Sequence, residues 1–189
     1  MESGLFAIIQ VVIFSVVSVF LIVLSWRSLH NPRCHGFYRF FAFEAILIVI
    51  LLNFPFWFKN PLSPLQLLSW LLLLFSIFFV IQGFYLLLKL GGSKPRENGS
   101  EKFAFENTAN LVTDGIYKYI RHPLYSSLLL LAWGAYLKHI SISGTVAVLF
   151  ATASLIVAAK MEERENLLSF GSAYATYIKK TKMFIPCLF

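Results

Sequence analysis

The segment 114–125 brings charged, aromatic and helix-breaking residues together (Asp-Gly-Ile-Tyr-Lys-Tyr-Ile-Arg-His-Pro-Leu-Tyr). Pro123 suits the first turn of a helix, where its missing N–H costs no hydrogen bond. It also disfavours helical geometry at His122. The free N–H groups at such a helix start, with Arg121 beside them, form a site suited to an anion. The simpler interpretation, that Arg121 and His122 only anchor the helix at lipid headgroups, stays equally open.

A second group of chemically active residues occupies 160–178. If this segment forms one helix at about 100° per residue, its apolar residues share one arc, and Glu163 falls in the middle of that arc. A carboxylate there faces the bundle rather than water and needs a partner. The partner is either a basic residue such as Arg121, in a structural ion pair, or a cationic group of a ligand. Glu162 falls on the opposite, solvated side, and Gly171 could break the helix. The apolar arc consists of Leu167, Phe170, Tyr174, Tyr177 and Ile178.

The composition indicates that membrane-spanning helices position these residues. Of the 189 residues, 58% are hydrophobic and 13% are charged, against roughly 45–50% and about 25% in soluble domains. The net charge of +7 does not gather into a stripe or tail. The basic residues instead mark the ends of apolar runs, which argues against a nucleic-acid partner.

A hydrocarbon core about 30 Å thick requires roughly 20 apolar residues in a helix. Five segments satisfy this or nearly so, the last two being short and joined by a tight turn. The first has no basic region before it, so we expect a retained span rather than a signal peptide. The sequence therefore predicts an all-α integral membrane bundle of about five transmembrane helices, in a single domain covering 1–189. The expected spans are 5–24, 40–58, 65–90, 124–139 and 142–160.

The distribution of lysine and arginine predicts the orientation of the bundle. Of the 16 basic residues, all except Lys59 and Lys138 fall on one side of the expected spans. Basic residues favour the cytoplasmic side. We therefore expect the N-terminus outside, with the loop 91–121 and the tail 161–189 meeting at the cytoplasmic face as the catalytic segment.

With these elements placed, the chain resembles the isoprenylcysteine carboxyl methyltransferases and their relatives, which include the membrane phospholipid N-methyltransferases. The likeness rests on an ordered set of short motifs between 115 and 186, and each motif is weak alone. The N-terminal part matches only as generic spans. The motifs are Gly115-Ile116-Tyr117, Arg121-His122-Pro123-Leu124-Tyr125, Glu162-Glu163, Phe170-Gly171-Ser172-Ala173-Tyr174-Ala175-Thr176-Tyr177 and Pro186.

The resemblance implies a site for S-adenosylmethionine, with S-adenosylhomocysteine as the product and no metal. The residues that it assigns to catalysis are Arg121, Glu163 and Tyr125. Those that it assigns to the cofactor are Tyr117, His122, Pro123, Tyr125, Glu162 and Glu163.

The expected acceptor is a lipophilic small molecule or lipidated substrate that reaches the site from the membrane lipid. A prenylcysteine-type carboxylate is the first expectation, since Arg121 could orient it as an ion pair. A lipid amine, a thiol or a phenol stays open; for these, His122 or Tyr125 would be the nearest bases.

Two other interpretations remain. Membrane reductases of the sterol type, which use NADPH, share a similar Arg-His-Pro-x-Tyr turn, although they differ after the helical hairpin. A non-catalytic membrane protein, such as a small transporter or assembly factor, is the alternative from another class. Binding of S-adenosylhomocysteine or of NADPH separates the three.

Overall fold

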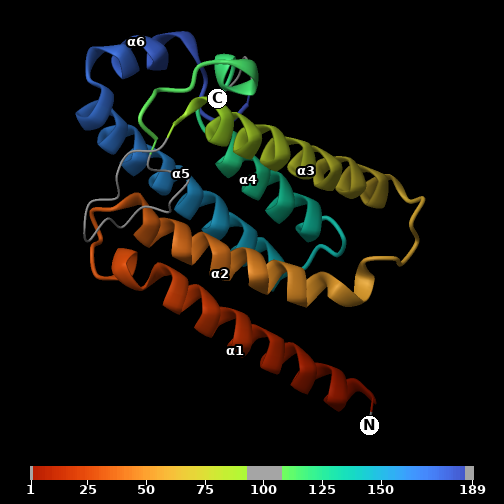
Figure 1. Cartoon of the computed structure of the whole chain (residues 1–189). Coiled ribbons are helices and arrows are strands. Elements are labelled where there is room, and N and C mark those ends of the chain that lie inside the picture. The colour runs from red at the N-terminus through yellow and green to blue at the C-terminus, as the bar shows by residue number, and fades with distance from the viewer. Residues whose placement is uncertain (1, 93–107, 186–189) are drawn as a thin grey trace.

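The computed structural model describes residues 2–92 and 108–185, and over these residues the chain is helical. The single β contact in the described part is an isolated parallel bridge between Ile120 and Lys182. The all-α prediction is therefore confirmed; Pro186 and residues 93–107 of the expected loop lie outside the described residues. The elements, drawn in Figure 1, are α1 (Glu2–Leu29), α2 (His35–Asn53), η1 (Phe54–Phe56), α3 (Pro64–Leu90), η3 (Gly115–Lys118), α4 (Pro123–Tyr136), α5 (Ile142–Phe170) and α6 (Ser172–Lys180).

In the part of the chain that the structure describes, four helices are long and apolar enough to cross a membrane: α1, α2 with η1, α3 and α5. The expected span 124–139 differs from these. Its helix, α4, has 14 residues, which is about 21 Å of helix against about 30 Å of hydrocarbon. The helix starts at Pro123, and the chain turns at 137–141 to enter α5. Over the described residues, α4 is therefore a short helix between the long helices α3 and α5.

The most extensive helix packing is between α2 and α5 and between α3 and α4. The α3–α4 pair is close because small residues lie at its contact, as is common between membrane helices. A Cβ added to Gly134 would lie 2.9 Å from Leu73, and one on Gly83 would lie 3.1 Å from Leu124. Ser69 Oγ donates to the Gly134 carbonyl at 2.6 Å. The Gly83 contact holds the start of α4 against the last turns of α3, where the candidate site lies.

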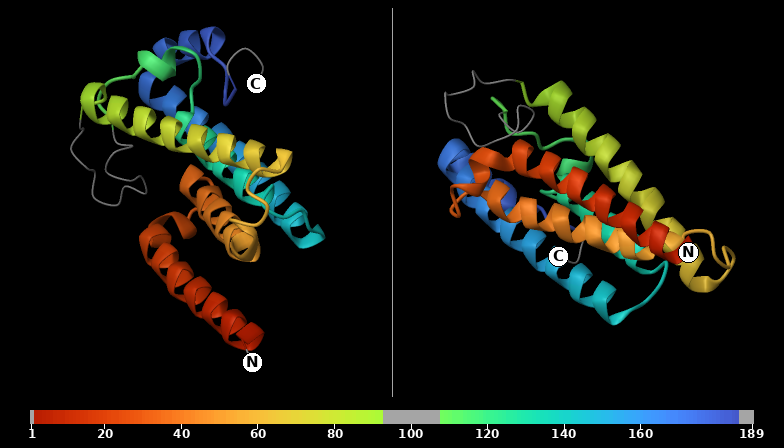
Figure 2. Two further views of the ribbon diagram at one scale, coloured as in Figure 1. Left: turned by 90° about the vertical axis from the view of Figure 1, so that its right-hand side faces the viewer. Right: turned by 90° about the horizontal axis from the view of Figure 1, so that it is seen from below.

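Helix α1 lies at the edge of the bundle, on the outer side of α2 (Figure 2). Most of its length is apolar and exposed, as expected of a helix that faces lipid. Two polar contacts connect it to α2: Ser18 Oγ donates to Glu44 Oε2 at 2.7 Å, and Gln10 Nε2 donates to the Leu51 carbonyl at 2.6 Å.

The prediction of one helix over 160–178 is wrong. Helix α5 continues beyond the expected span to Phe170, but Gly171 then adopts φ 56°. This left-handed conformation suits glycine because it has no Cβ. The chain turns there, and α6 runs in a new direction (Figure 1). Tyr174 and Tyr177 are buried, whereas Leu167 is exposed, so the apolar residues of 160–178 do not form one arc.

Candidate active site

The candidate site lies where α3 ends, α4 begins and α5 turns into α6. Backbone hydrogen bonds join the segment before α4 to the C-terminal tail: Arg121 N–H donates to Lys182 O at 2.8 Å, and Lys182 N–H donates to Tyr119 O at 3.0 Å. The expected loop and tail therefore adjoin, within the described ranges 108–121 and 161–185.

Arg121 connects three elements at this junction. Its Nε donates to Glu163 Oε1 at 2.6 Å, and its Nη1 donates to the carbonyls of Ile178 and Thr181. The side chains of Arg121 and Glu163 are 9% and 15% exposed. A charge-assisted hydrogen bond with so little solvent contact is strong, and removing one member leaves the other charge unbalanced. In this structure the partner of Glu163 is therefore Arg121.

His122 caps the start of α4 with non-helical geometry (φ −124°, ψ 61°), and Pro123 occupies the first turn, as the sequence predicted. Two carboxylates flank the buried imidazole. His122 Nε2 lies 3.4 Å from Glu163 Oε1, and Nδ1 lies 3.9 Å from Glu162 Oε2. The ring stacks on Tyr125 with centroids 5.6 Å apart.

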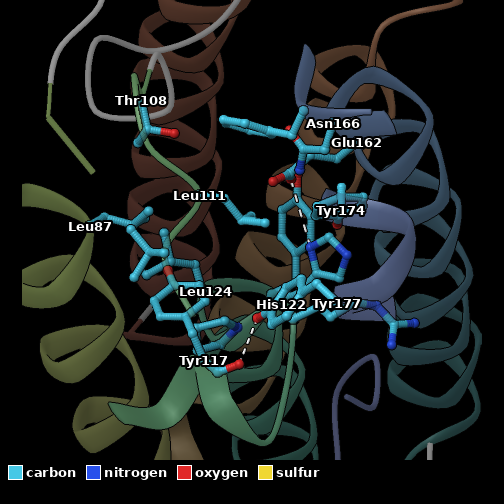
Figure 3. Close-up of a pocket in the computed structure, with 15 residues that line it drawn as sticks. Leu87, Thr108, Leu111, Tyr117, His122, Leu124, Glu162, Asn166, Tyr174 and Tyr177 are labelled. Carbon is cyan, nitrogen blue, oxygen red and sulfur yellow. Dashed lines mark hydrogen bonds and ion pairs between the residues drawn. The ribbon is translucent and has the colours of Figure 1, made fainter. Parts of the chain in front are cut away.

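A cavity opens beside His122 between α3 and the α5–α6 turn (Figure 3). Leucines from α3, the 108–112 segment and α4 form one wall, while Glu162, Asn166 and Tyr174 form the opposite wall. The cavity thus has an apolar side and a polar, acidic side. Its lining consists of Leu87, Thr108, Leu111, Val112, Tyr117, Arg121, His122, Pro123, Leu124, Tyr125, Glu162, Asn166, Phe170, Tyr174 and Tyr177.

Nearly all of the sequence-predicted site residues are brought together at this cavity. The exception is Glu163, which contacts Arg121 and His122 but is not among the lining residues. Glu162, predicted to be the more solvated of the two glutamates, lines the cavity with its side chain 27% exposed. The two adjacent glutamates therefore have different surroundings: Glu162 faces the cavity and Glu163 faces the arginine.

Sequence reasoning missed several lining residues. Asn166 could have been found, because it lies one helical turn after Glu162 and so shares its face. Leu87 carried no such signal, since α3 is apolar all round. Thr108, Leu111 and Val112 belong to an irregular segment, where periodicity gives no orientation.

Three tyrosines of the site are held as neutral phenols. Burial raises the pKa of Tyr117, Tyr174 and Tyr177 well above the ordinary value; for Tyr174 a hydrogen bond with Asn166 opposes part of this rise. Tyr177 donates its hydroxyl to the Tyr117 carbonyl at 2.6 Å, and Tyr117 donates to the Gly83 carbonyl at 3.3 Å. The hydroxyls of Tyr177 and Tyr117 thus join α6, η3 and α3, and all three neutral phenols are poor proton acceptors.

A hydrogen-bonded clamp holds the end of α5. The Nδ1 of His35 lies 2.9 Å from Glu165 Oε2, and the His35 backbone N–H donates to Glu165 Oε1 at 3.0 Å. Cys34 adjoins them, and these three are the one set of metal-ligating side chains found close together in the described ranges. Arg39 Nη1 approaches His35 Nε2 at 3.4 Å. A donor at Nε2 places the ring proton on Nδ1, toward Glu165, so the geometry favours a hydrogen bond over a metal ligand.

The cavity offers complementary chemistry to a ligand with cationic groups and hydroxyls. Glu162 supplies a carboxylate, Asn166 an amide, and Phe170 an aromatic face beside them. S-adenosylmethionine carries an ammonium, a sulfonium, ribose hydroxyls and an adenine ring, so the residues present fit that group. The leucine wall is suited to an apolar acceptor.

Comparison with known proteins identifies relatives of the chain. Residues 64–170, from α3 to the end of α5, match the family model described as phospholipid methyltransferase. Methanethiol S-methyltransferase 2 of Bradyrhizobium diazoefficiens is 34% identical over 74 residues, which are 39% of this chain and 28% of that protein. Methanethiol S-methyltransferase of Pseudomonas sp. (strain GM41(2012)) is 25% identical over 130 residues, or 69% of this chain and 47% of that protein.

The matched parts span between 28% and 47% of these two relatives. No solved structure matches the chain. The family match itself covers more than half of the sequence and includes the Arg-His-Pro and Glu-Glu motifs. It confirms the resemblance inferred from those motifs. The chain therefore belongs to the phospholipid methyltransferase family of membrane methyltransferases.

Proposed function

We propose that this chain transfers a methyl group from S-adenosylmethionine to the sulfur of a small lipophilic thiol. The observation that carries the proposal is the cavity itself, in which Glu162 and Asn166 face a leucine wall and His122 lies at the base of α4. The family membership and the names of the relatives support it. Neither the sterol-reductase nor the non-catalytic interpretation has comparable support.

The acidic wall of the cavity would hold the methyl donor. Glu162 would bind a cationic group or the ribose hydroxyls, and Asn166 would add a second polar contact from the same face of α5. When bound, S-adenosylmethionine supplies a methyl group already activated by its positively charged sulfur. The protein would then contribute alignment and exclusion of water. The Arg121–Glu163 pair would serve alignment, because it fixes α4 against α5.

The engagement of Arg121 bears on the acceptor. A carboxylate acceptor would need Arg121 as its counter-ion, but this guanidinium already binds Glu163 and two backbone carbonyls. A thiol needs no counter-ion and instead needs a proton acceptor. His122 lines the cavity and could take the thiol proton, with Glu162 and Glu163 flanking its ring. The prenylcysteine-type carboxylate stays a second candidate because Arg121 also lines the cavity.

Two experiments test the proposal. Calorimetric titration of the detergent-purified protein with S-adenosylhomocysteine, with NADPH in parallel, should give saturable binding of the first alone. Binding of NADPH alone, or of neither ligand, would reject the methyltransferase proposal. A methyl-transfer assay then compares short alkyl thiols with a prenylated cysteine carboxylate. Faster turnover of the carboxylate would reject the thiol and favour the second candidate.

A further inference from the structure

A second polar cavity lies at the opposite end of the bundle from the candidate site. It is formed by the α2–α3 connection (54–63) and the α4–α5 turn (137–141), which meet at the end of the bundle away from α6 (Figure 1). Its volume is about 320 Å³. It is bounded by the ends of the candidate spans, so in a membrane it lies at the level of the lipid headgroups.

The lining of this cavity is basic. Lys59, Lys138 and His139 all contribute to it, and no aspartate or glutamate is among the lining residues that the structure describes. These lysines are the same two that the sequence places on this side of the expected spans. Residues far apart in the chain thus gather the positive charge of this end at one cavity.

Lys138 is buried in a preformed setting. The residue is 5% exposed, and its Nζ donates to Gln66 Oε1 at 3.0 Å. The ammonium also lies 3.4 Å from the centre of the Trp70 ring and 5.6 Å from that of Trp57. The buried Gln66 returns a hydrogen bond to the Lys138 carbonyl at 3.0 Å. A lysine that only anchors a helix extends its ammonium into water, whereas this one is folded beneath aromatic rings.

The charge of Lys138 has only neutral partners in the described structure. Its contacts there are an amide oxygen and two aromatic faces, and the ion pairs recorded among those residues all lie at the other end of the bundle. Burying a cation without a counter-charge is costly. The nearby start of α3, capped by Ser63, adds the positive end of a helix dipole. An anion in the cavity would balance this charge.

We propose that this cavity binds the phosphate group of an anionic phospholipid, with Lys138 and Lys59 as its cationic ligands. Phosphate is the anion abundant at headgroup level, and its oxygens can accept hydrogen bonds from several donors at once. Ser63 and Asn60, which also line the cavity, add polar side chains. The stacked rings of Phe56 and His139, with centroids 3.9 Å apart, add an aromatic face to the cavity.

The test is native mass spectrometry of the delipidated full chain with phosphatidylglycerol, inorganic phosphate and diacylglycerol as separate probes. Lys59→Gln and Lys138→Gln each remove one ligand, and Lys179→Gln removes an exposed lysine at the other end of the bundle. Circular dichroism and thermal unfolding check that each variant folds. If Lys138→Gln does not fold, the test rests on Lys59→Gln, which replaces an exposed residue.

We expect one tightly held phosphatidylglycerol, weakened about fivefold by Lys59→Gln and more by Lys138→Gln, because one juxtamembrane lysine contributes about that factor. Lys179→Gln should leave the affinity unchanged. Competition by inorganic phosphate would support a site that recognises phosphate alone, and its failure would support a site that also needs the acyl chains. Equal retention of diacylglycerol, or equal weakening by all three variants, would overturn the proposal.

Discussion

The two ends of the bundle each bury a cation but surround it differently. At the candidate active site, Arg121 is 9% exposed on its side chain and donates to the Glu163 carboxylate and two carbonyls. At the opposite end, Lys138 is 5% exposed and contacts an amide oxygen and two indole rings. A cation balanced by a carboxylate joins elements of the fold. A buried cation whose partners are all neutral can still form an ion pair with a ligand. Mutations at the two ends should therefore differ in the size of their effect on stability.

The largest effect is expected for Arg121→Ala. It leaves Glu163 buried without its counter-charge and releases the end of α6 from α4. Such a change costs about 3 kcal/mol of unfolding free energy, and binding of S-adenosylhomocysteine should be lost. Thermal unfolding in detergent and calorimetry measure the two effects. If the variant binds the ligand normally and only its yield falls, Arg121 is an anchor and not part of the site.

The two adjacent glutamates should separate binding from stability. Glu162→Gln removes a carboxylate from the cavity wall, so we expect about a tenfold loss of affinity for S-adenosylhomocysteine, the value of one charge-assisted hydrogen bond, with little change in unfolding temperature. Glu163→Gln should lower the unfolding temperature more, because it weakens the pair with Arg121. The reverse pattern, measured by calorimetry and thermal unfolding together, would assign ligand binding to Glu163.

Lys138→Gln should affect stability much less than Arg121→Ala does. Glutamine keeps a donor for Gln66 while removing the uncompensated charge, so stability in detergent without anionic lipid should change by less than about 1 kcal/mol. Added phosphatidylglycerol should then stabilise the unmutated chain and leave the variant unaffected. Thermal unfolding with and without this lipid measures the difference. A large loss of stability in lipid-free detergent would show that Lys138 is structural, as Arg121 is.

The His35–Glu165 clamp near the active site offers a matched pair of variants. Asparagine places an amide N–H near the position of the histidine Nδ1, whereas glutamine places it near Nε2. His35→Asn should therefore keep the contact with Glu165, and His35→Gln should cost about 1 kcal/mol. Amide hydrogen exchange over 160–170 should rise only in the second variant. If the purified chain retains zinc and Cys34→Ser loses it, these residues form a metal site and not a hydrogen-bonded clamp.

The smallest effect concerns alkaline pH. The raised pKa values of Tyr117, Tyr174 and Tyr177 mean that the unfolded state ionises these phenols first. Their contribution to stability is therefore complete below about pH 10, the unfolded pKa of tyrosine, and declines as the pH rises above it. Absorbance of phenolate at 295 nm should show these three of the 8 tyrosines ionising only on unfolding. Full ionisation of a folded chain at pH 11 would contradict this.

Local properties of the chain could be predicted from the sequence. Composition and apolar run length identified the membrane bundle, since the hydrocarbon core sets the length of a span. The start of α4 was predicted because the ring of Pro123 fixes its own φ angle and disfavours helical backbone geometry at His122. The ordered motifs identified the family and most of the lining residues, because short motifs can be recognised in a sequence without knowledge of the fold.

The failures share one cause. The prediction of one helix over 160–178 failed at Gly171, because glycine can adopt both a helical and a turn conformation. Packing of Tyr174 and Tyr177 against the bundle selects the turn. Helix α4 ends at Tyr136, three residues before the expected span 124–139 ends, because the chain turns at 137–141 to enter α5. In both cases several local conformations were possible, and contacts with distant residues decided between them.

The sequence by itself determined the helical class, the apolar spans and the residue types gathered around the Arg-His-Pro turn. Only the tertiary structure decided which side chains meet. In the folded chain, Glu163 of α5 faces Arg121. Glu162, which lies about 100° away around the same helix, faces the cavity. The tertiary structure also brought Gln66 and Trp70 around Lys138. Helical periodicity predicts the direction in which a side chain points from its own helix. The packing of the whole chain determines which element lies opposite it.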